Sequence, residues 1–207
     1  MVRPARPDDV PTILALIREL AAYEREPNAV VATEADLEAA LFSDTAALFG
    51  LIAEHPGADG PVVAGFALWF LNFSTWVGRH GIYLEDLYVR PELRGYGYGS
   101  ELLVELARIA DERGYGRVEW AVLDWNESAH RFYTSLHAVP MQEWTIWRVS
   151  GDALPKLAQK SAHYQDSPKD GKQCYGCNFF VAPNACKQVD GDISPTGYCL
   201  LWVKKPS

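Results

Sequence analysis

Apolar residues recur every three or four positions in two long stretches, the spacing of one buried face of an α-helix. The first stretch follows Asp8 and Asp9, which favour a helix start, and the second ends at Gly114, which favours a helix end. A shorter helix is predicted from Thr33, because Thr33 and Asp36 have the spacing of a capping box. The apolar positions of these helices are Ile13, Leu16, Ile17, Leu20, Leu37, Leu41, Phe42, Leu102, Leu103, Leu106 and Ile109.

Strand-forming runs lie between these helices. They predict strands over residues 2–5, 48–54, 62–73, 83–89, 117–123 and 144–149, with one more helix over 127–135. Residues 55–61 have turn chemistry, so the second and third strands form a hairpin. This order predicts an α/β (α+β) fold, in which helices flank a mixed, mostly antiparallel sheet.

Composition narrows the class of protein. A hydrophobic content of 48% over 207 residues is enough for a buried core. The sequence contains no run near the roughly 18 apolar residues that cross a bilayer, so no membrane partner is expected. The first residues also lack the apolar segment of a secretory signal, which favours a cytoplasmic protein. A net charge of −8 argues against nucleic acid as a partner.

The basic residues change from arginine to lysine at one point along the chain. Residues 1–155 contain twelve Arg, no Lys and twenty-three Asp and Glu, whereas residues 156–207 contain seven Lys, no Arg and four Asp. All four cysteines lie in the second stretch. We therefore predict two domains, 1–155 and 156–207.

A glycine-rich turn over residues 94–100 separates a predicted strand from a predicted helix. Glycine lets the backbone approach a ligand, and the free N–H groups and dipole of a helix start favour an anion. The turn predicts a site for phosphate or pyrophosphate, with an ordinary loop as the alternative. The turn is not a P-loop, because it lacks the Gly-Lys-Ser/Thr sequence. It is also not a good dinucleotide-binding motif, because it follows a late strand of the predicted fold.

The motif Arg94-x-x-Gly97-x-Gly99, after Leu87-Tyr88-Val89, resembles the coenzyme A signature of the GNAT superfamily of N-acetyltransferases. The resemblance covers roughly residues 2–150 and implies acetyl-CoA as cosubstrate and a homodimer. Segments similar to the spermidine/spermine (diamine) acetyltransferase branch are 17–24, 83–86, 124–127 and 131–133. The implied cofactor-binding residues are Leu87, Val89, Arg94, Gly95, Tyr96, Gly97, Tyr98, Gly99, Ser100 and Asn126.

The resemblance also implies catalytic roles. Tyr133 would protonate the leaving thiolate, Glu85 would take the amine proton through water, and a backbone N–H near Leu87 would stabilise the oxyanion. Glu85 and Asp86 are neighbours in a strand, so only one of the two side chains faces the cleft. The alternatives are a core aromatic at Tyr133 and a carboxylate at Glu85 that merely pairs with Arg.

An acidic domain suits a small cationic amine as substrate. Glu24 and Asp86 are predicted to attract it, and Trp76 and Trp144 to line its chain or hold its ammonium group by cation–π contact. Ordinary packing is the alternative for both tryptophans. After Tyr133 this chain has His137-Ala138 where the branch usually has Gly-Ala, so a polyamine, a diamine and a lysine-like amino acid all stay open.

The second domain is defined by the spacing Cys174-x2-Cys177-x8-Cys186-x12-Cys199. Two disulfides would suit a secreted chain, and zinc more often shows two close pairs. Four thiolates on an iron–sulfur cube need no such symmetry. Aromatic residues that would exclude water from a cluster crowd the segment: Tyr164, Tyr175, Phe179, Phe180, Tyr198 and Trp202.

Residues 186–202 and the upstream Tyr164-Gln165-Asp166 are similar to high-potential iron–sulfur proteins. This resemblance, over roughly 160–207, implies a small irregular domain with a [4Fe-4S] cluster on the four cysteines and a redox partner. That family usually works after export, in conflict with the cytoplasmic expectation. The alternative to an acetyltransferase is therefore an electron-transfer protein on an acyl-CoA-binding scaffold, in which redox state regulates acetylation.

Overall fold

The computed structural model describes residues 1–151 and 153–205, without the side chains of 155–158. The chain divides into two compact units, residues 1–139 and 140–207, and each is described by itself. The predicted boundary after residue 155 falls inside the second unit, so domains 1–155 and 156–207 stay a proposal.

The first unit holds one five-stranded sheet in the order β1-β2-β3-β4-β5. All neighbouring strands are antiparallel except β4 and β5, which are parallel, so the predicted mixed sheet is confirmed. Two 3₁₀ turns, Pro7–Asp9 and Pro91–Leu93, precede α1 and α3. The elements are β1 (Val2–Pro4), α1 (Val10–Tyr23), α2 (Glu34–Phe42), β2 (Phe49–His55), β3 (Val62–Ser74), β4 (Arg79–Val89), α3 (Tyr98–Glu112), β5 (Val118–Glu119) and α4 (Glu127–Ser135).

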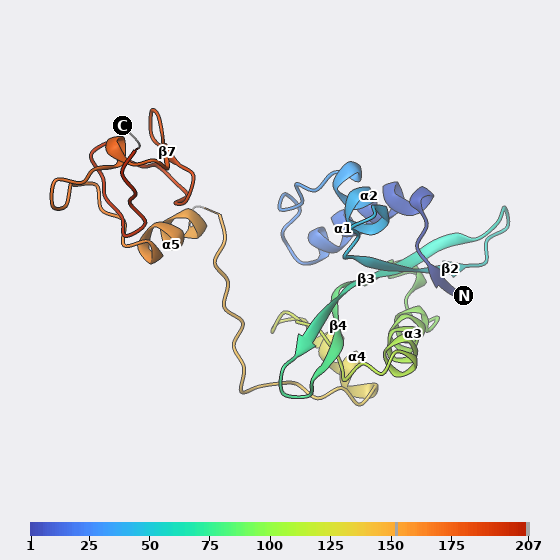
Figure 1. Cartoon of the computed structure of the whole chain (residues 1–207). Helices are drawn as coiled ribbons and strands as arrows, with labels where there is room; N and C mark the ends of the chain where they lie inside the picture. Colours follow the sequence, from blue (N-terminus) through green and yellow to red (C-terminus); the bar gives the residue numbers. More distant parts are fainter. Residues whose placement is uncertain (152, 206–207) are drawn as a thin grey trace. The chain divides into compact units, whose positions relative to one another are not determined.

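Helices cover both faces of this sheet, with α1 and α2 on one side and α3 and α4 on the other (Figure 1). Each face has its own apolar core, because strand side chains alternate between faces. Ile13, Leu16 and Phe66 are fully buried on the first face, and Leu102 and Leu106 on the second. The sheet is thus held between two layers of helices, and its strand β4 carries Glu85 and Asp86.

Local signals behave as predicted at two helix ends, and a third differs. Thr33 Oγ1 accepts a hydrogen bond from the Asp36 N–H (3.2 Å), and the Asp36 carboxylate accepts one from the Thr33 N–H (2.9 Å). Asp9 stands before α1, but its carboxylate accepts from Arg6 N–H (2.7 Å) and Arg3 instead of capping α1. Gly114 follows α3 with a φ of +67°, the left-handed conformation that ends helices.

Two strand predictions need correction. The strand predicted over 117–123 is reduced to Val118–Glu119, and residues 144–149 form no strand. The apolar residues of that second stretch are exposed, including Trp144 (66%) and Trp147 (91%). Alternation predicts a strand only where a neighbouring strand supplies hydrogen-bond partners, and the described structure supplies none there.

The second unit is small and mostly irregular. It contains α5 (Ala153–Ser161), a 3₁₀ turn over Cys174–Gly176 and a two-stranded ribbon of β6 (Phe180–Val181) and β7 (Ala185–Cys186). Its core consists of Ala162, Cys174, Cys177, Phe180, Val189, Ile193 and Cys199, with Tyr164, Phe179, Cys186 and Trp202 packed against it.

Of the helices in the described part of the chain, none has both the length and the apolar character to span a bilayer.

Candidate active site

The turn over residues 94–100 lies between β4 and α3, as the sequence predicts. Gly95 and Gly97 have φ values of +86° and +92°, a region that side chains rarely allow, and Gly97 caps α3. A Cβ at either position would meet no atom within 4 Å, so space lies open above this backbone. The first N–H groups of α3, at Tyr98, Gly99 and Ser100, point out of the helix without helical partners.

The side chains around this turn do different work. Tyr98 is buried and its hydroxyl contacts His55 Nδ1 at 2.8 Å, whereas Tyr96 is 63% exposed. Gly99 serves packing, since a Cβ there would lie 3.2 Å from the Phe132 ring of α4. Two of the three glycines thus leave the turn open, and the third lets α4 approach α3.

Arg94 is the first residue of this turn, and its side chain reaches back to the end of β4. Its Nε donates to the carbonyl of Val89 at 2.9 Å, and its guanidinium lies over the rings of Tyr23 (5.0 Å) and Tyr88 (5.7 Å). The side chain therefore braces the turn against α1.

The two predicted carboxylates on β4 differ in environment because the strand carries a bulge. Leu68 pairs with Asp86 and Trp69 with Leu84, so Glu85 is the extra residue. Glu85 is exposed and Asp86 is half-buried. Burial, and then the charges of Glu85 and Glu24, raises the pKa of Asp86 to about 6. The ladder between β4 and β5 ends at Tyr83 and Glu119, before Leu87, so these strands separate next to the carboxylates.

Tyr133 lies on α4, half-buried between Trp120 (4.8 Å between ring centres) and Phe132 (5.2 Å). Burial, and then the negative charge of Glu24, raises its pKa to about 12, so the phenol keeps its proton at neutral pH. Glu24 acts on the pKa of both Tyr133 and Asp86. The structure thus brings these three predicted residues together.

Asn126 caps α4, because its Oδ1 accepts from the Ala129 N–H at 3.2 Å. The same oxygen accepts from the hydroxyl of Tyr23 at 3.1 Å. Tyr23 was not predicted as a site residue, although it stands beside Glu24 in the segment that carries the family resemblance. A contact between residues 103 positions apart leaves no pattern in one sequence.

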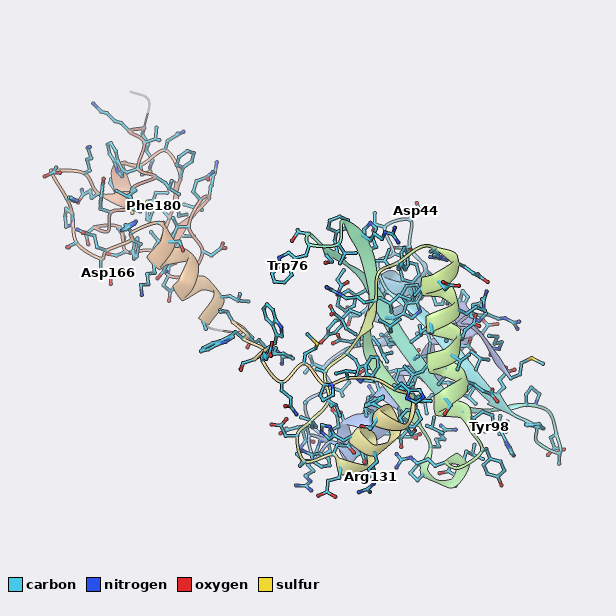
Figure 2. The ribbon with its side chains drawn as sticks, turned by 90° about the horizontal axis from the view of Figure 1, so that it is seen from below. Asp44, Trp76, Tyr98, Arg131, Asp166 and Phe180 are labelled. Carbon is cyan, nitrogen blue, oxygen red and sulfur yellow. The ribbon has the colours of Figure 1, made fainter. Side chains whose placement is uncertain are left out.

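The two predicted tryptophans belong to different units. Trp76 projects from the turn between β3 and β4 (Figure 2), is 88% exposed, and stands at the end of β4 opposite to Val89. Within this chain the fold does not bring it to Asp86. Trp144 belongs to the second unit, in the stretch without a strand.

The four cysteines share the core of the second unit as free thiols. The N–H groups of Gln188 and Val203 each donate to a sulfur, of Cys186 and Cys177, at 3.4 Å. Burial, followed by the charges of the other three thiols, raises the pKa of Cys174 to about 11. Even so, the side chains of the described residues form no group of three or more His, Cys, Asp or Glu that could hold a metal ion.

Named relatives are similar to this chain over most of their length. A bovine thialysine N-epsilon-acetyltransferase is 42% identical and matches 77% of this chain and 98% of its own. An Arabidopsis thaliana L-ornithine N5-acetyltransferase is 34% identical and matches 75% of this chain and 86% of its own.

A solved structure and a family model agree with these relatives. An integron cassette protein from the mobile metagenome of V. cholerae superposes with a TM-score of 0.63 at 28% identity, over 77% of this chain and 97% of its own. Residues 14–138, which carry the turn, the β4 carboxylates and Tyr133, match the model of the Acetyltransferase (GNAT) family. The chain therefore belongs to the GNAT family and is an N-acetyltransferase.

Proposed function

We propose that this enzyme transfers the acetyl group of acetyl-CoA directly to a primary amine of a small cationic substrate. The substrate class is a polyamine, a diamine or a lysine-like amino acid. The observation that carries the proposal is the half-buried pair of carboxylates, Glu24 and Asp86, near Tyr133. The names of the relatives support it, since thialysine and ornithine are both amino acids with a side-chain amine.

The turn over residues 94–100 would hold the pyrophosphate of coenzyme A. The open space above Gly95 and Gly97 and the free N–H groups that begin α3 support this assignment. The contribution of Arg94 would be indirect, because its guanidinium already contacts Val89 and Tyr23.

Starting from the ammonium form of the substrate, nitrogen loses two protons, one before attack and one from the tetrahedral intermediate, and the sulfur gains one, so one proton is released overall. The neutral amine nitrogen attacks the thioester carbon, and a backbone N–H near Leu87 stabilises the resulting oxyanion. The carbon–sulfur bond then breaks, and Tyr133 donates its proton to the departing thiolate. The products are the N-acetylated amine and coenzyme A.

Glu85 is the proposed acceptor of the amine proton, and Asp86 and Glu24 the groups that attract the ammonium. One observation favours Asp86 for the first role as well. Its pKa of about 6 lies close to the operating pH, as a general base requires, and it is less exposed than Glu85. The two assignments differ in which variant loses turnover.

An assay of thiol release from acetyl-CoA with a panel of amines tests the function. Thialysine, ornithine, lysine, diamines and spermidine form the panel, and a neutral amine of equal length is the control. Glu85→Gln and Asp86→Asn, compared on the best substrate, identify the base by the larger loss of kcat. Absence of thiol release with every amine would refute the substrate class.

We further propose that the second unit holds a [4Fe-4S] cluster on Cys174, Cys177, Cys186 and Cys199. The supporting observation is that four free thiols share one small core and that backbone N–H groups donate to two of the sulfurs. The described side chains form no group that could hold a metal ion, so the four sulfurs would have to move together for a cluster to bind. A bound cluster would supply one-electron transfer to a redox partner.

Iron and sulfide content of anaerobically prepared protein tests this second proposal. About four irons per chain are expected, because a cube holds four. Zinc in place of iron, or no metal, would refute it. A homodimer and a cytoplasmic location stay predictions from the sequence.

A further inference from the structure

Tyr23 joins three parts of the first unit that lie far apart in the sequence. It is the last residue of α1, and its ring and hydroxyl have different partners. The hydroxyl donates to Asn126 Oδ1 at 3.1 Å and lies 3.3 Å from Ser128 Oγ, both at the start of α4. The guanidinium of Arg94 lies 5.0 Å from the centre of the ring, and Arg94 begins the turn over residues 94–100, called the phosphate turn below.

The hydroxyl contact lies at the cap of α4. Asn126 Oδ1 accepts from three donors: Tyr23, Ser128 Oγ (3.0 Å) and the Ala129 N–H (3.2 Å). The helix has only nine residues, too few to be stable without tertiary contacts, so contacts at its ends decide its position. Tyr133 lies seven residues after Asn126 on this helix.

The ring contacts lie at the phosphate turn. Arg94 is held between the Val89 carbonyl and the Tyr23 ring, and the ring of Trp125 lies 6.1 Å from that of Tyr23 between centres. Arg25 covers Trp125 at 4.3 Å. The segment before α4 is therefore fastened to the end of α1, which also carries Glu24.

We propose that Tyr23 is a positioning residue that couples occupancy of the phosphate turn to the placement of Tyr133. When the turn holds the pyrophosphate, Arg94 and the Tyr23 ring are fixed, and the Tyr23 hydroxyl then holds Asn126 and the start of α4. This inference rests on the proposed role of Tyr133 as the acid. Tyr23 itself need not touch the reacting atoms.

Tyr23→Phe tests the proposal, since it removes the hydroxyl and keeps the ring. We expect kcat to fall roughly tenfold while the Kd for coenzyme A changes by less than about twofold, because only the geometry of the acid is disturbed. Tyr115→Phe is the matched control, a tyrosine-to-phenylalanine change beyond α3 that should leave both constants unchanged. Equal losses in kcat and coenzyme A binding, or no loss in kcat, would overturn the proposal.

A double-mutant cycle identifies the route of the effect. Asn126→Ala should lower kcat at least as much as Tyr23→Phe does, because it removes the acceptor of all three hydrogen bonds. The double variant should be no worse than Asn126→Ala alone, because the Tyr23 hydroxyl then has no bond left to lose at that cap. Additive losses would mean that Tyr23 acts by another route.

A readout without turnover separates this inference from the proposed function. Coenzyme A should slow amide hydrogen exchange in α4 of the wild type, and the protection should be lost in Tyr23→Phe. Loss of protection in an enzyme that acetylates no tested amine would keep the coupling and refute the substrate. Protection that is equal in both proteins would refute the coupling.

Discussion

Ionisation of the Asp86 carboxyl group is unfavourable in the folded protein. It is half-buried, and Glu85 and Glu24 add negative charge around it. Natural proteins place like charges together mainly where the group has a task. A positively charged amine would reduce this repulsion between carboxylates, so the arrangement favours the binding of a cationic substrate.

The pH dependence of stability should report Asp86. Its folded pKa, about 6, lies above the usual value of 3.8, so its contribution is fully present below about pH 4 and is lost as the pH rises through 6. Asp86→Asn should therefore be more stable than the wild type at pH 7.5, by about 2 kcal/mol after allowance for partial exposure. Urea unfolding at pH 7.5 and pH 4 measures this, and an equal difference at both pH values would contradict it.

The same substitution, which should raise the stability at pH 7.5, should lower the activity. In its proposed role ionised Asp86 attracts the amine, so kcat/KM of the wild type should rise with pH through about 6. Asp86→Asn should lose that limb and raise KM for the amine roughly tenfold or more, since a pair of carboxylates becomes a single one. Steady-state kinetics from pH 5 to pH 9 measures both effects. An unchanged profile would assign the titration to another group.

Tyr133→Phe removes the proposed acid and keeps the ring between Trp120 and Phe132. We expect kcat to fall roughly a hundredfold with little change in the Kd of acetyl-CoA, because proton donation is needed only after attack. Isothermal titration and stopped-flow thiol release separate the two constants. A loss confined to binding would assign Tyr133 to packing.

At the scale of elements, one ion cluster fastens the first strand to the first helix. Arg3 on β1 donates to Asp9 at 2.7 and 2.9 Å and to Glu54 on β2 at 2.7 Å. Asp9 also accepts from the Arg6 N–H and is 8% exposed. These bonds set where α1 starts, and α1 delivers Tyr23 and Glu24 at its other end.

Asp9→Ala should destabilise the first unit by about 3 kcal/mol, because it leaves Arg3 without its main partner and the Arg6 N–H unsatisfied. The Arg3 hydrogen bond lowers the pKa of Asp9, so this stabilisation is present at neutral pH and is lost as the pH falls through the folded pKa. Thermal unfolding at pH 7 against the surface control Asp44→Ala measures it. A change equal to that of the control would contradict the prediction.

At the scale of the whole molecule, the cores are separate. The first unit buries its own two layers, and the second buries its cysteines and aromatics around Ile193. A domain as small as the second depends on more than apolar burial, which is why a bound cluster would matter for its folding.

Calorimetry should therefore give two transitions. Cys199→Ser should lower only the transition of the second unit, because Cys199 is 5% exposed in that core. Asp9→Ala should lower only the transition of the first unit. A single transition that both variants lower equally would mean that the units fold together.

Sequence patterns were sufficient where the physics is local. The cap at Thr33 and Asp36, the glycine after α3 and the left-handed turn at Gly95 and Gly97 depend on a few neighbouring residues, and each lies where it was predicted. The family motif works for the same reason, because a phosphate turn is made by consecutive backbone groups.

Only the tertiary structure decided the rest. The bulge that exposes Glu85 and half-buries Asp86 arises from pairing with β3, and the Tyr23–Asn126 bond joins residues 103 positions apart. The stretch 144–149 has the alternation of a strand but no described pairing. Which groups distant in the sequence come close in the fold determines strand register, burial and pKa. Local patterns in one amino-acid sequence do not give those distances.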